Sequence, residues 1–342
     1  MLKYINEYTN TQEEYGYACG RVRELEKSLL TKEIIDKMIE TRSLEDSIKI
    51  LEENSVDNYN INNYDYISID THLKGIIKKT INLIKEISPN PHLYKLFSWK
   101  YDFHNLKVLL KGKFIGKKEI TTLYEYGNFK VDILESAIFD EKYQLLPSIV
   151  ERIIKQSEDE YMKSSDLQLI EVLLDHGYYE IIFNLLNEIN HPFLYYFFKK
   201  EIDLLNFIIS CRSKIRNIKK SKLPLILIKQ GNLSIQKYIS IYENSIHSWP
   251  SYFQKTDYGQ IIENGVKEWQ EKNSMLELEK LVDNYLINLL KIGKYTSFGI
   301  ESIFAYYFAK ENDIKNIRII LNGKRNLLKN NIIRENIRDC YV

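Results

Sequence analysis

The chain has 342 residues, of which 44% are hydrophobic, and this is enough to build apolar cores in two or three domains. Its 48 Lys and Arg residues nearly balance 47 Asp and Glu residues, so the net charge of +1 provides no overall field that would favour nucleic acid or an anionic membrane. The N-terminus lacks a hydrophobic signal segment and no apolar run is long enough to span a bilayer, so we expect no direct bilayer insertion.

The N-terminal third is predicted to be mostly helical. Residues 14–30 alternate charged and apolar side chains with helical spacing, and their predicted apolar side contains Tyr17, Val22, Leu25 and Leu29. The Asn-rich stretch 54–68 is predicted to be a loop, and 71–87 is predicted to be a second helix.

The middle of the chain continues the helical pattern. We predict a helix over 151–162, a helical hairpin over 167–189 that breaks near His176 and Gly177, a loop over 245–257, and a helix over 276–290. No alternating strand pattern bounded by hairpin turns is present in the sequence, so the predicted fold class is all-α.

The clearest helical pattern lies near the C-terminus, over 298–324. Charged side chains such as Lys310, Asp313 and Arg318 are predicted to occupy the polar side of this helix, and Gly323 with Lys324 is predicted to end it. The apolar side is formed by residues at steps of three, four or seven, namely Ile303, Tyr307, Ile314, Ile317 and Leu321.

Two earlier segments, 93–113 and 194–214, repeat this C-terminal pattern, and we call the three segments the marker helices. Each contains an aromatic residue, an aspartate, an asparagine, a large apolar residue and a final lysine at equivalent positions. These are Phe97, Asp102, Asn105, Leu106 and Lys113; Phe198, Asp203, Asn206, Phe207 and Lys214; and Phe308, Asp313, Asn316, Ile317 and Lys324.

A second element also recurs, since a short polar turn precedes a new amphipathic stretch at three places. Ser43, Asn128 and Asn232 are predicted to be the N-caps of these stretches. A period of about 100 residues exceeds that of ordinary solenoids, so three similar helical domains are predicted, over 1–113, 114–214 and 215–342, with the marker helices shared at the boundaries. No Gly-, Ser- or Pro-rich linker separates them, which predicts a rigid connection.

The middle marker helix departs from the other two. It has Ser210, Cys211 and Ser213 where the others have leucines and glycine, so its C-terminal end is predicted to differ. Cys211 is also one of three widely spaced cysteines, with Cys19 and Cys340, and this arrangement favours a reducing cytoplasm over a disulfide framework.

No motif in the sequence predicts catalysis. Phosphate-binding glycine loops, paired histidines at metal-ligand spacing and a nucleophile elbow are all missing from the sequence, so no catalytic, cofactor-binding or metal site is predicted. The acidic runs near Glu52 and Asp159 are typical of solvated helix faces.

The repeated polar residues leave two alternatives. The Asp and Asn pairs either satisfy nearby backbone at helix junctions, which we favour, or form three equivalent binding groups around an axis. The basic residues near the marker-helix ends either complement helix dipoles or form one basic face that binds a partner. They are Lys111, Lys113, Lys117 and Lys118; Lys214, Arg216, Lys219 and Lys220; and Lys324, Arg325 and Lys329.

The stretches YGYACGRVRELEKSLL (15–30), LYKLFSWKYDFHNLKVLLKGK (93–113), FGIESIFAYYFAKENDIKNIRIILNGKRNLL (298–328) and NIIRENIRDCYV (331–342) resemble the C subunit of V-type and A-type ATPases and ATP synthases. That family includes its eukaryotic counterpart, the d subunit of the vacuolar ATPase. The resemblance covers essentially the whole chain. It implies a funnel of three similar helical domains about a pseudo-threefold axis.

The resemblance also implies a mechanical role. Such a subunit is part of the rotor on the cytoplasmic side of the membrane, where it joins the central shaft, made of the D and F subunits, to the membrane proteolipid ring and transmits torque without catalysing a reaction. From the residues alone, a free-standing helical scaffold that binds partner helices is the second hypothesis. An unrecognised all-α enzyme is the third.

Overall fold

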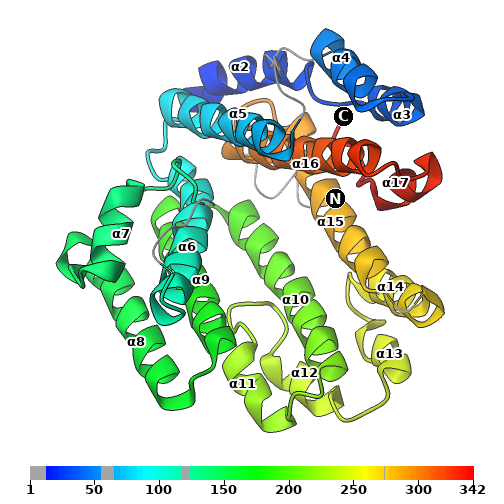
Figure 1. The fold of residues 1–342 in the computed structure, drawn as a ribbon. Helices are drawn as coiled ribbons and strands as arrows, with labels where there is room; N and C mark the ends of the chain where they lie inside the picture. Colours follow the sequence, from blue (N-terminus) through cyan, green and yellow to red (C-terminus); the bar gives the residue numbers. More distant parts are fainter. Residues whose placement is uncertain (1–12, 55–64, 118–122, 273) are drawn as a thin grey trace.

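The computed structural model describes residues 13–54, 65–117, 123–272 and 274–342, and all regular structure within them is helical (Figure 1). The all-α prediction is therefore confirmed. The predicted loop over 54–68 lies largely outside the described residues. The α-helices are α2 (Gly16–Glu26), α3 (Lys32–Glu40), α4 (Leu44–Asn54), α5 (Tyr66–Ile87), α6 (Leu93–Phe114), α7 (Val131–Phe139), α8 (Ser148–Ser164), α9 (Leu167–Ile189), α10 (Pro192–Ile215), α11 (Leu223–Ile226), α12 (Ile235–Ile241), α13 (Trp249–Phe253), α14 (Gly259–Lys272), α15 (Leu276–Leu290), α16 (Ile300–Arg325) and α17 (Asn330–Asn336).

The marker helices are α6, α10 and α16, and each packs against the long helix that precedes another marker helix. Helix α6 contacts α9, α10 contacts α15, and α16 contacts α5. Figure 1 shows the consequence, because the C-terminal helix α16 lies with the N-terminal helices α2 to α5 while it also contacts α15, which precedes it in sequence. The chain therefore returns to its beginning before it ends.

The three marker helices meet in a cluster of aromatic side chains, which we call the aromatic junction. Phe304 of α16 lies at the centre, with its ring centroid 5.7 Å from Phe97 of α6, 5.1 Å from Phe197 and 5.9 Å from Phe198 of α10. Phe308 extends the cluster, with its centroid 6.0 Å from that of Phe97 and 5.1 Å from that of Phe197. Offset and edge-on ring pairs at these separations are favourable beyond the area they bury.

Helix α16 is a central helix and not a surface one. The apolar residues predicted to share one side, from Ile303 to Leu321, are all buried. However, Lys310 and Asp313, which the pattern assigns to the polar side, are each only 2% exposed. That part of the prediction is wrong because other helices surround α16, and periodicity alone does not reveal contacts made by the polar side of a helix.

The predicted hairpin over 167–189 is wrong, because α9 is one continuous helix over these residues. Gly177 does not break it. A Cβ atom at Gly177 would lie 2.6 Å from a side-chain carbon of Ile153, so the glycine allows α8 to approach α9 closely. The predicted loop over 245–257 is also partly wrong, since it contains the short helix α13.

The predicted N-caps are confirmed at one position of three. The Ser43 hydroxyl accepts a hydrogen bond from the Asp46 amide at the start of α4. Asn128 and Asn232 instead precede the N-cap residues Lys130 and Ser234 by two positions.

The prediction for Tyr17 is wrong, because the pattern assigns it to the apolar side of its helix but its side chain is 74% exposed.

All three marker helices end in the same way, with a left-handed residue followed by a backbone hydrogen bond that spans the last turn. The left-handed residues are Gly116, Asn217 and Leu327, with φ of 72°, 55° and 55°. The amides of Lys117, Ile218 and Leu328 then donate to the carbonyls of Gly112, Ser213 and Gly323, at 2.9 Å in each case. The predicted stop at Gly323 is therefore four residues early, and the predicted difference in the middle helix is absent.

Of the three left-handed residues, Leu327 is the one least suited to that backbone conformation, and this gives a stability prediction. A branched residue in the left-handed region costs about 1–2 kcal/mol, and Leu327 is 89% exposed, so it gains little from burial. We expect Leu327→Gly to raise the free energy of unfolding by about 0.5–1 kcal/mol, after subtraction of the glycine entropy cost. Urea denaturation of the variant and the wild-type chain measures this change in the free energy of unfolding. Ile115→Gly, at an exposed position with ordinary φ, is the control and should lower stability.

Candidate functional site: the marker-helix contacts and the central cavity

Each marker-helix asparagine forms two hydrogen bonds with the backbone of a single loop residue, an arrangement that we call an asparagine bridge. Asn206 accepts from the Ile228 amide at 2.9 Å and donates to the Ile228 carbonyl at 2.8 Å. Asn105 makes the same pair with Tyr124, and Asn316 makes it with Arg338. All three asparagines are fully buried, so each bridge satisfies backbone groups that would otherwise lack partners.

The marker-helix aspartates also bind loop backbone. Asp102 accepts from the amides of Asn128 and Phe129 at 2.8 and 3.2 Å, and Asp203 accepts from the Leu233 amide at 2.9 Å. Burial raises the pKa of Asp102 to about 6, while these backbone hydrogen bonds oppose the increase. Each aspartate therefore fixes the loop that leads into the following short helix.

In the third copy, the loop comes from the opposite end of the chain. Asp313 accepts from the amide of Leu30 at 2.9 Å, and Leu30 precedes α3 as Phe129 precedes α7. The repeat in the sequence instead matches the turn at Ser43, which starts α4 and does not contact Asp313 in any described hydrogen bond. Leu30 and Asp313 are 283 residues apart, and sequence spacing gives no sign of such a pairing.

Glycines make the first two aspartate contacts possible. A Cβ atom on Gly127 would lie 2.1 Å from an Asp102 carboxylate oxygen, and one on Gly231 would lie 2.3 Å from an oxygen of Asp203. These distances are far below van der Waals contact. The two glycines are therefore present because the loop backbone lies directly against the carboxylate.

The final lysine of each marker helix binds just beyond the end of a short neighbouring helix. Lys324 donates to the carbonyl of Thr41 after α3, and Lys214 donates to the carbonyl of Tyr242 after α12 at 2.6 Å. Lys113 binds Glu141 after α7 at 3.0 Å, and also Glu158 at 2.9 Å. A cation near the C-terminal end of a helix is stabilising, so these three lysines fasten neighbouring helices. Each of the three has a partner within the protein, as the first alternative expects. Lys118 lies outside the described residues, and the basic face formed by the helix-end residues stays a prediction.

A cavity of about 400 Å³ lies beside the aromatic junction, between α5, α6, α10, α15 and α16. The apolar part of its wall includes Phe197, Leu286 and Phe308. The charged part carries three cations and three carboxylates, which are Lys100, Lys315 and Arg318, with Glu201, Asp283 and Glu311.

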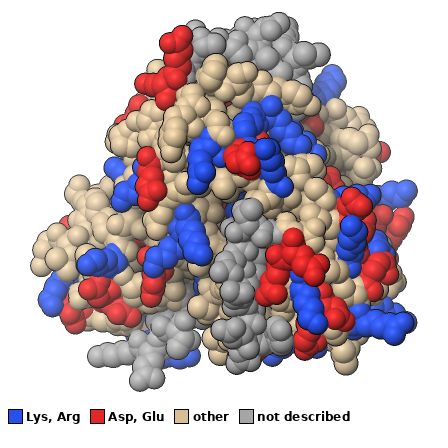
Figure 2. Space-filling model, turned by 90° about the horizontal axis from the view of Figure 1, so that it is seen from above, with Lys and Arg blue, Asp and Glu red and all other residues tan. Residues whose placement is uncertain are grey.

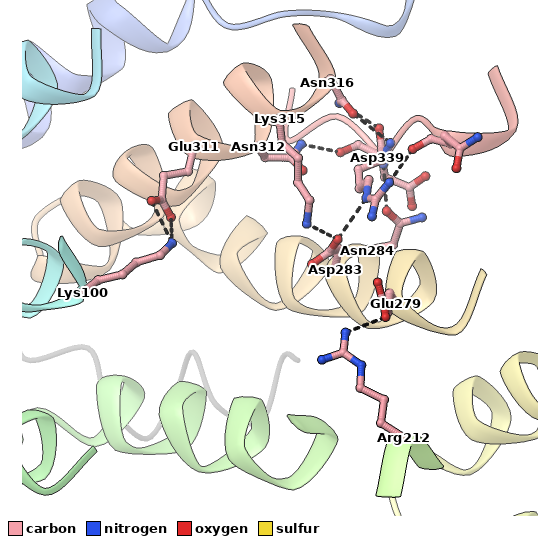
Figure 3. A network of polar contacts seen from close by, with 12 residues as sticks. Lys100, Arg212, Glu279, Asp283, Asn284, Glu311, Asn312, Lys315, Asn316 and Asp339 are labelled. Carbon is pink, nitrogen blue, oxygen red and sulfur yellow. Dashed lines mark hydrogen bonds and ion pairs between the residues drawn. The ribbon is translucent and has the colours of Figure 1, made fainter. Parts of the chain in front are cut away.

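Lys100 and Glu311 form the central ion pair of this cavity, with two distances of 2.9 and 3.0 Å (Figure 3). The hydroxyls of Tyr101 and Tyr307 also donate to the Glu311 carboxylate, each at 2.8 Å. Burial disfavours both charges, but the mutual attraction outweighs it, so the pKa of Lys100 is raised and that of Glu311 is lowered. Glu311 is thus held in its charged form.

Figure 3 shows a second polar network, which joins α15, α16 and the C-terminal tail. The carboxylate of Asp283 in α15 accepts hydrogen bonds from Lys315 of α16 and, at 2.9 Å, from the guanidinium of Arg338. Arg338 is also the residue bridged by Asn316, so the same tail segment is held at two points. On the face seen in Figure 2, basic and acidic side chains are interspersed, in agreement with the nearly neutral net charge.

Neither a metal site nor a membrane span is found in the part of the chain that the structure describes. No group of three or more His, Cys, Asp or Glu side chains lies close enough together there to hold a metal ion. No helix within it combines the length and the apolar character needed to cross a bilayer.

The residues that fasten the marker helices are predictable from the repeat in the sequence, whereas those that line the cavity were not predicted. The signal for the latter is present in the sequence, because Lys100, Glu201 and Glu311 each precede the repeated aspartate by two positions. Two positions along a helix correspond to about 200°, so these residues lie nearly opposite the aspartates and face the cavity. Their charges differ in sign between copies, so a search for shared residue types does not find them.

These contacts define a class of protein: a helical body in which one fastening pattern recurs on three long helices around a cavity. A family model described as "ATP synthase (C/AC39) subunit" matches residues 18–336. The chain belongs to this family, whose members include the C subunits of V-type and A-type ATPases, and the resemblance noted in the sequence is confirmed.

Curated relatives match along nearly the whole chain. The C subunit of the V-type sodium ATPase of Enterococcus hirae is 26% identical over 328 residues, which cover 96% of this chain and 99% of the relative. The C subunit of the A-type ATP synthase of Methanococcoides burtonii is 25% identical, with 96% and 95% covered, and that of Methanocaldococcus jannaschii is 22% identical, with 94% and 85% covered.

Proposed function

We propose that this chain is the non-catalytic rotor subunit that joins the central shaft, made of the D and F subunits, to the membrane proteolipid ring, and that it transmits torque between them. It acts on the cytoplasmic face of the membrane as a peripheral subunit. Membership of the C/AC39 family supports a place in a rotary ATPase. The proposal goes beyond family membership in naming the shaft and the ring as the partners of this chain.

The observation that carries the proposal is the way in which the three marker helices are joined. They meet at Phe304 and Phe308, and each is also fixed by an asparagine bridge, an aspartate contact and a lysine contact. A part that transmits torque must not lose rotation in internal hinges. The aromatic junction in the N-terminal half of each marker helix, the buried Asp and Asn contacts near its middle and the lysine contact at its C-terminal end together give a stiff body.

We further propose that the chain contains three equivalent helical domains, over 1–113, 114–214 and 215–342, and that neighbouring domains share the marker helices at these boundaries. The contacts refine those boundaries. Because α16 packs on α5 and binds Leu30, it completes the N-terminal domain, while α6 opens the second domain and α10 opens the third. The central cavity then lies where the three domains meet and offers a socket for the end of the shaft.

The test is depletion of this subunit from the host complex, followed by add-back. We expect the depleted complex to lose the contact between the D/F shaft and the ring, to retain ATP hydrolysis by its catalytic subunits, and to lose ion transport. Added wild-type chain should restore transport. If the chain does not co-purify with the shaft and the ring, or if transport persists in its absence, the rotor assignment is wrong, and stable capture of other helical partners would favour a scaffold.

A further inference from the structure

Three equivalent positions face the central cavity with unequal charges. Lys100 on α6, Glu201 on α10 and Glu311 on α16 each lie two residues before the repeated aspartate of their marker helix, and all three line the cavity. A socket with three equivalent walls accepts an asymmetric object in three rotations that differ by about a third of a turn. Unequal side chains at these positions remove that ambiguity.

The lining charges are almost fully paired within the described residues. Lys100 pairs with Glu311, Lys315 pairs with Asp283, and Arg318 pairs with Asp70 just outside the cavity wall. Glu201 is the exception. Its described hydrogen bond is the one that it accepts from the Tyr179 hydroxyl at 3.3 Å, and no cation of the described chain lies within ion-pair distance of it.

The surroundings of Glu201 make this carboxylate incompletely satisfied. Burial and the nearby Glu311 carboxylate raise its pKa to about 7, against the opposing effects of Lys100 and the Tyr179 hydroxyl. Asp283 on α15 adds a further carboxylate to the same wall. A half-buried carboxylate with one weak hydrogen bond gains much from an incoming cation, since the cavity screens charges less than bulk water does.

We infer that Glu201 receives a basic side chain, Lys or Arg, from the end of the shaft, and that this contact fixes the rotational position of the shaft in the cavity. The inference rests on the proposed rotor function. The Lys100–Glu311 pair closes the other two equivalent positions, so the basic side chain has one carboxylate to bind. The cavity thereby selects one of three orientations by charge.

The test measures binding of the co-expressed D/F shaft of the same host complex to wild-type chain, to Glu201→Gln and to the control Glu180→Gln, which lies in an outward-facing pair with Arg152. We expect Glu201→Gln to weaken binding by at least about 30-fold and the control to change it less than about twofold. Wild-type affinity should rise as pH increases through about 7, because Glu201 then loses its proton, and the variant should lack this rise.

The variant should fold, because glutamine keeps the shape and removes a charge that burial disfavours; a thermal melt checks this. In density maps of the assembled complex, the shaft should take one orientation in wild type and more than one in Glu201→Gln. If wild-type chain binds the shaft and Glu201→Gln binds equally tightly in one orientation, the inference is wrong while the proposed function stands. If wild-type chain does not bind the shaft at all, the proposed function itself fails.

Discussion

Replacement of Phe304 by alanine is expected to lower the free energy of unfolding by about 3–5 kcal/mol, the largest loss that we expect from a single substitution in this chain. The side chain is fully buried, and its ring contacts aromatic rings of both other marker helices. Its removal takes away apolar burial and leaves a cavity at a place where three helices meet. Because each of these helices is also held by buried Asp and Asn contacts near its middle and a lysine contact at its C-terminal end, the helices cannot move together to fill the space.

Urea denaturation, followed by far-UV circular dichroism, measures this effect. Tyr17→Ala is the matched control, because Tyr17 is 74% exposed on α2 and its truncation should change stability by less than about 0.5 kcal/mol. If the two variants unfold at the same urea concentration, Phe304 is not the centre of a packed junction. On the proposed function, the Phe304→Ala complex should also transport fewer ions per ATP hydrolysed.

Substitution of Asn206 by alanine is expected to cost about 3 kcal/mol, although it removes only a few atoms. The asparagine bridge is fully buried, and its loss leaves both the amide and the carbonyl of Ile228 without their partner. Each buried backbone group left unsatisfied costs about 1–3 kcal/mol, so the two together exceed the worth of an ordinary hydrogen bond.

Asn244→Ala provides the comparison, since Asn244 is exposed and its side-chain amide donates to the hydroxyl of Tyr252 at the surface. Its loss should cost less than about 0.5 kcal/mol. Hydrogen exchange localises the effect, because the Ile228 amide should exchange much faster in Asn206→Ala than in wild type. Unchanged protection of that amide would mean that the bridge does not hold the loop.

Much of the helical content was predictable from local pattern. Helices α5, α8, α15 and α16 lie where apolar residues recur with helical spacing, and Ser43 begins α4 as predicted. The triplicated residues that fasten the marker helices also recur at equivalent positions in the sequence. These features depend on residues within a few turns of one another, which is the range over which helix propensity and capping act.

Other features could not be predicted, because they depend on a neighbour that is distant in sequence. Gly177 looks like a helix break until Ile153 is seen against it, and Asn128 looks like an N-cap until its side chain is seen to bind Asp102. The same holds for Lys324, whose position favours its own helix end but whose ammonium group binds the carbonyl after α3.

The amino-acid order is enough to show that this protein is helical, that one helix occurs in three copies, and which polar residues the copies share. Only the packed chain reveals that the last copy completes the N-terminal part. It also brings Lys100, Glu201 and Glu311 to one cavity, where Glu201 is the lining carboxylate that no cation of the described residues pairs with. The physical reason is range: helical periodicity is set by hydrogen bonds about four residues apart, whereas Leu30 and Asp313 meet only after the whole chain has packed.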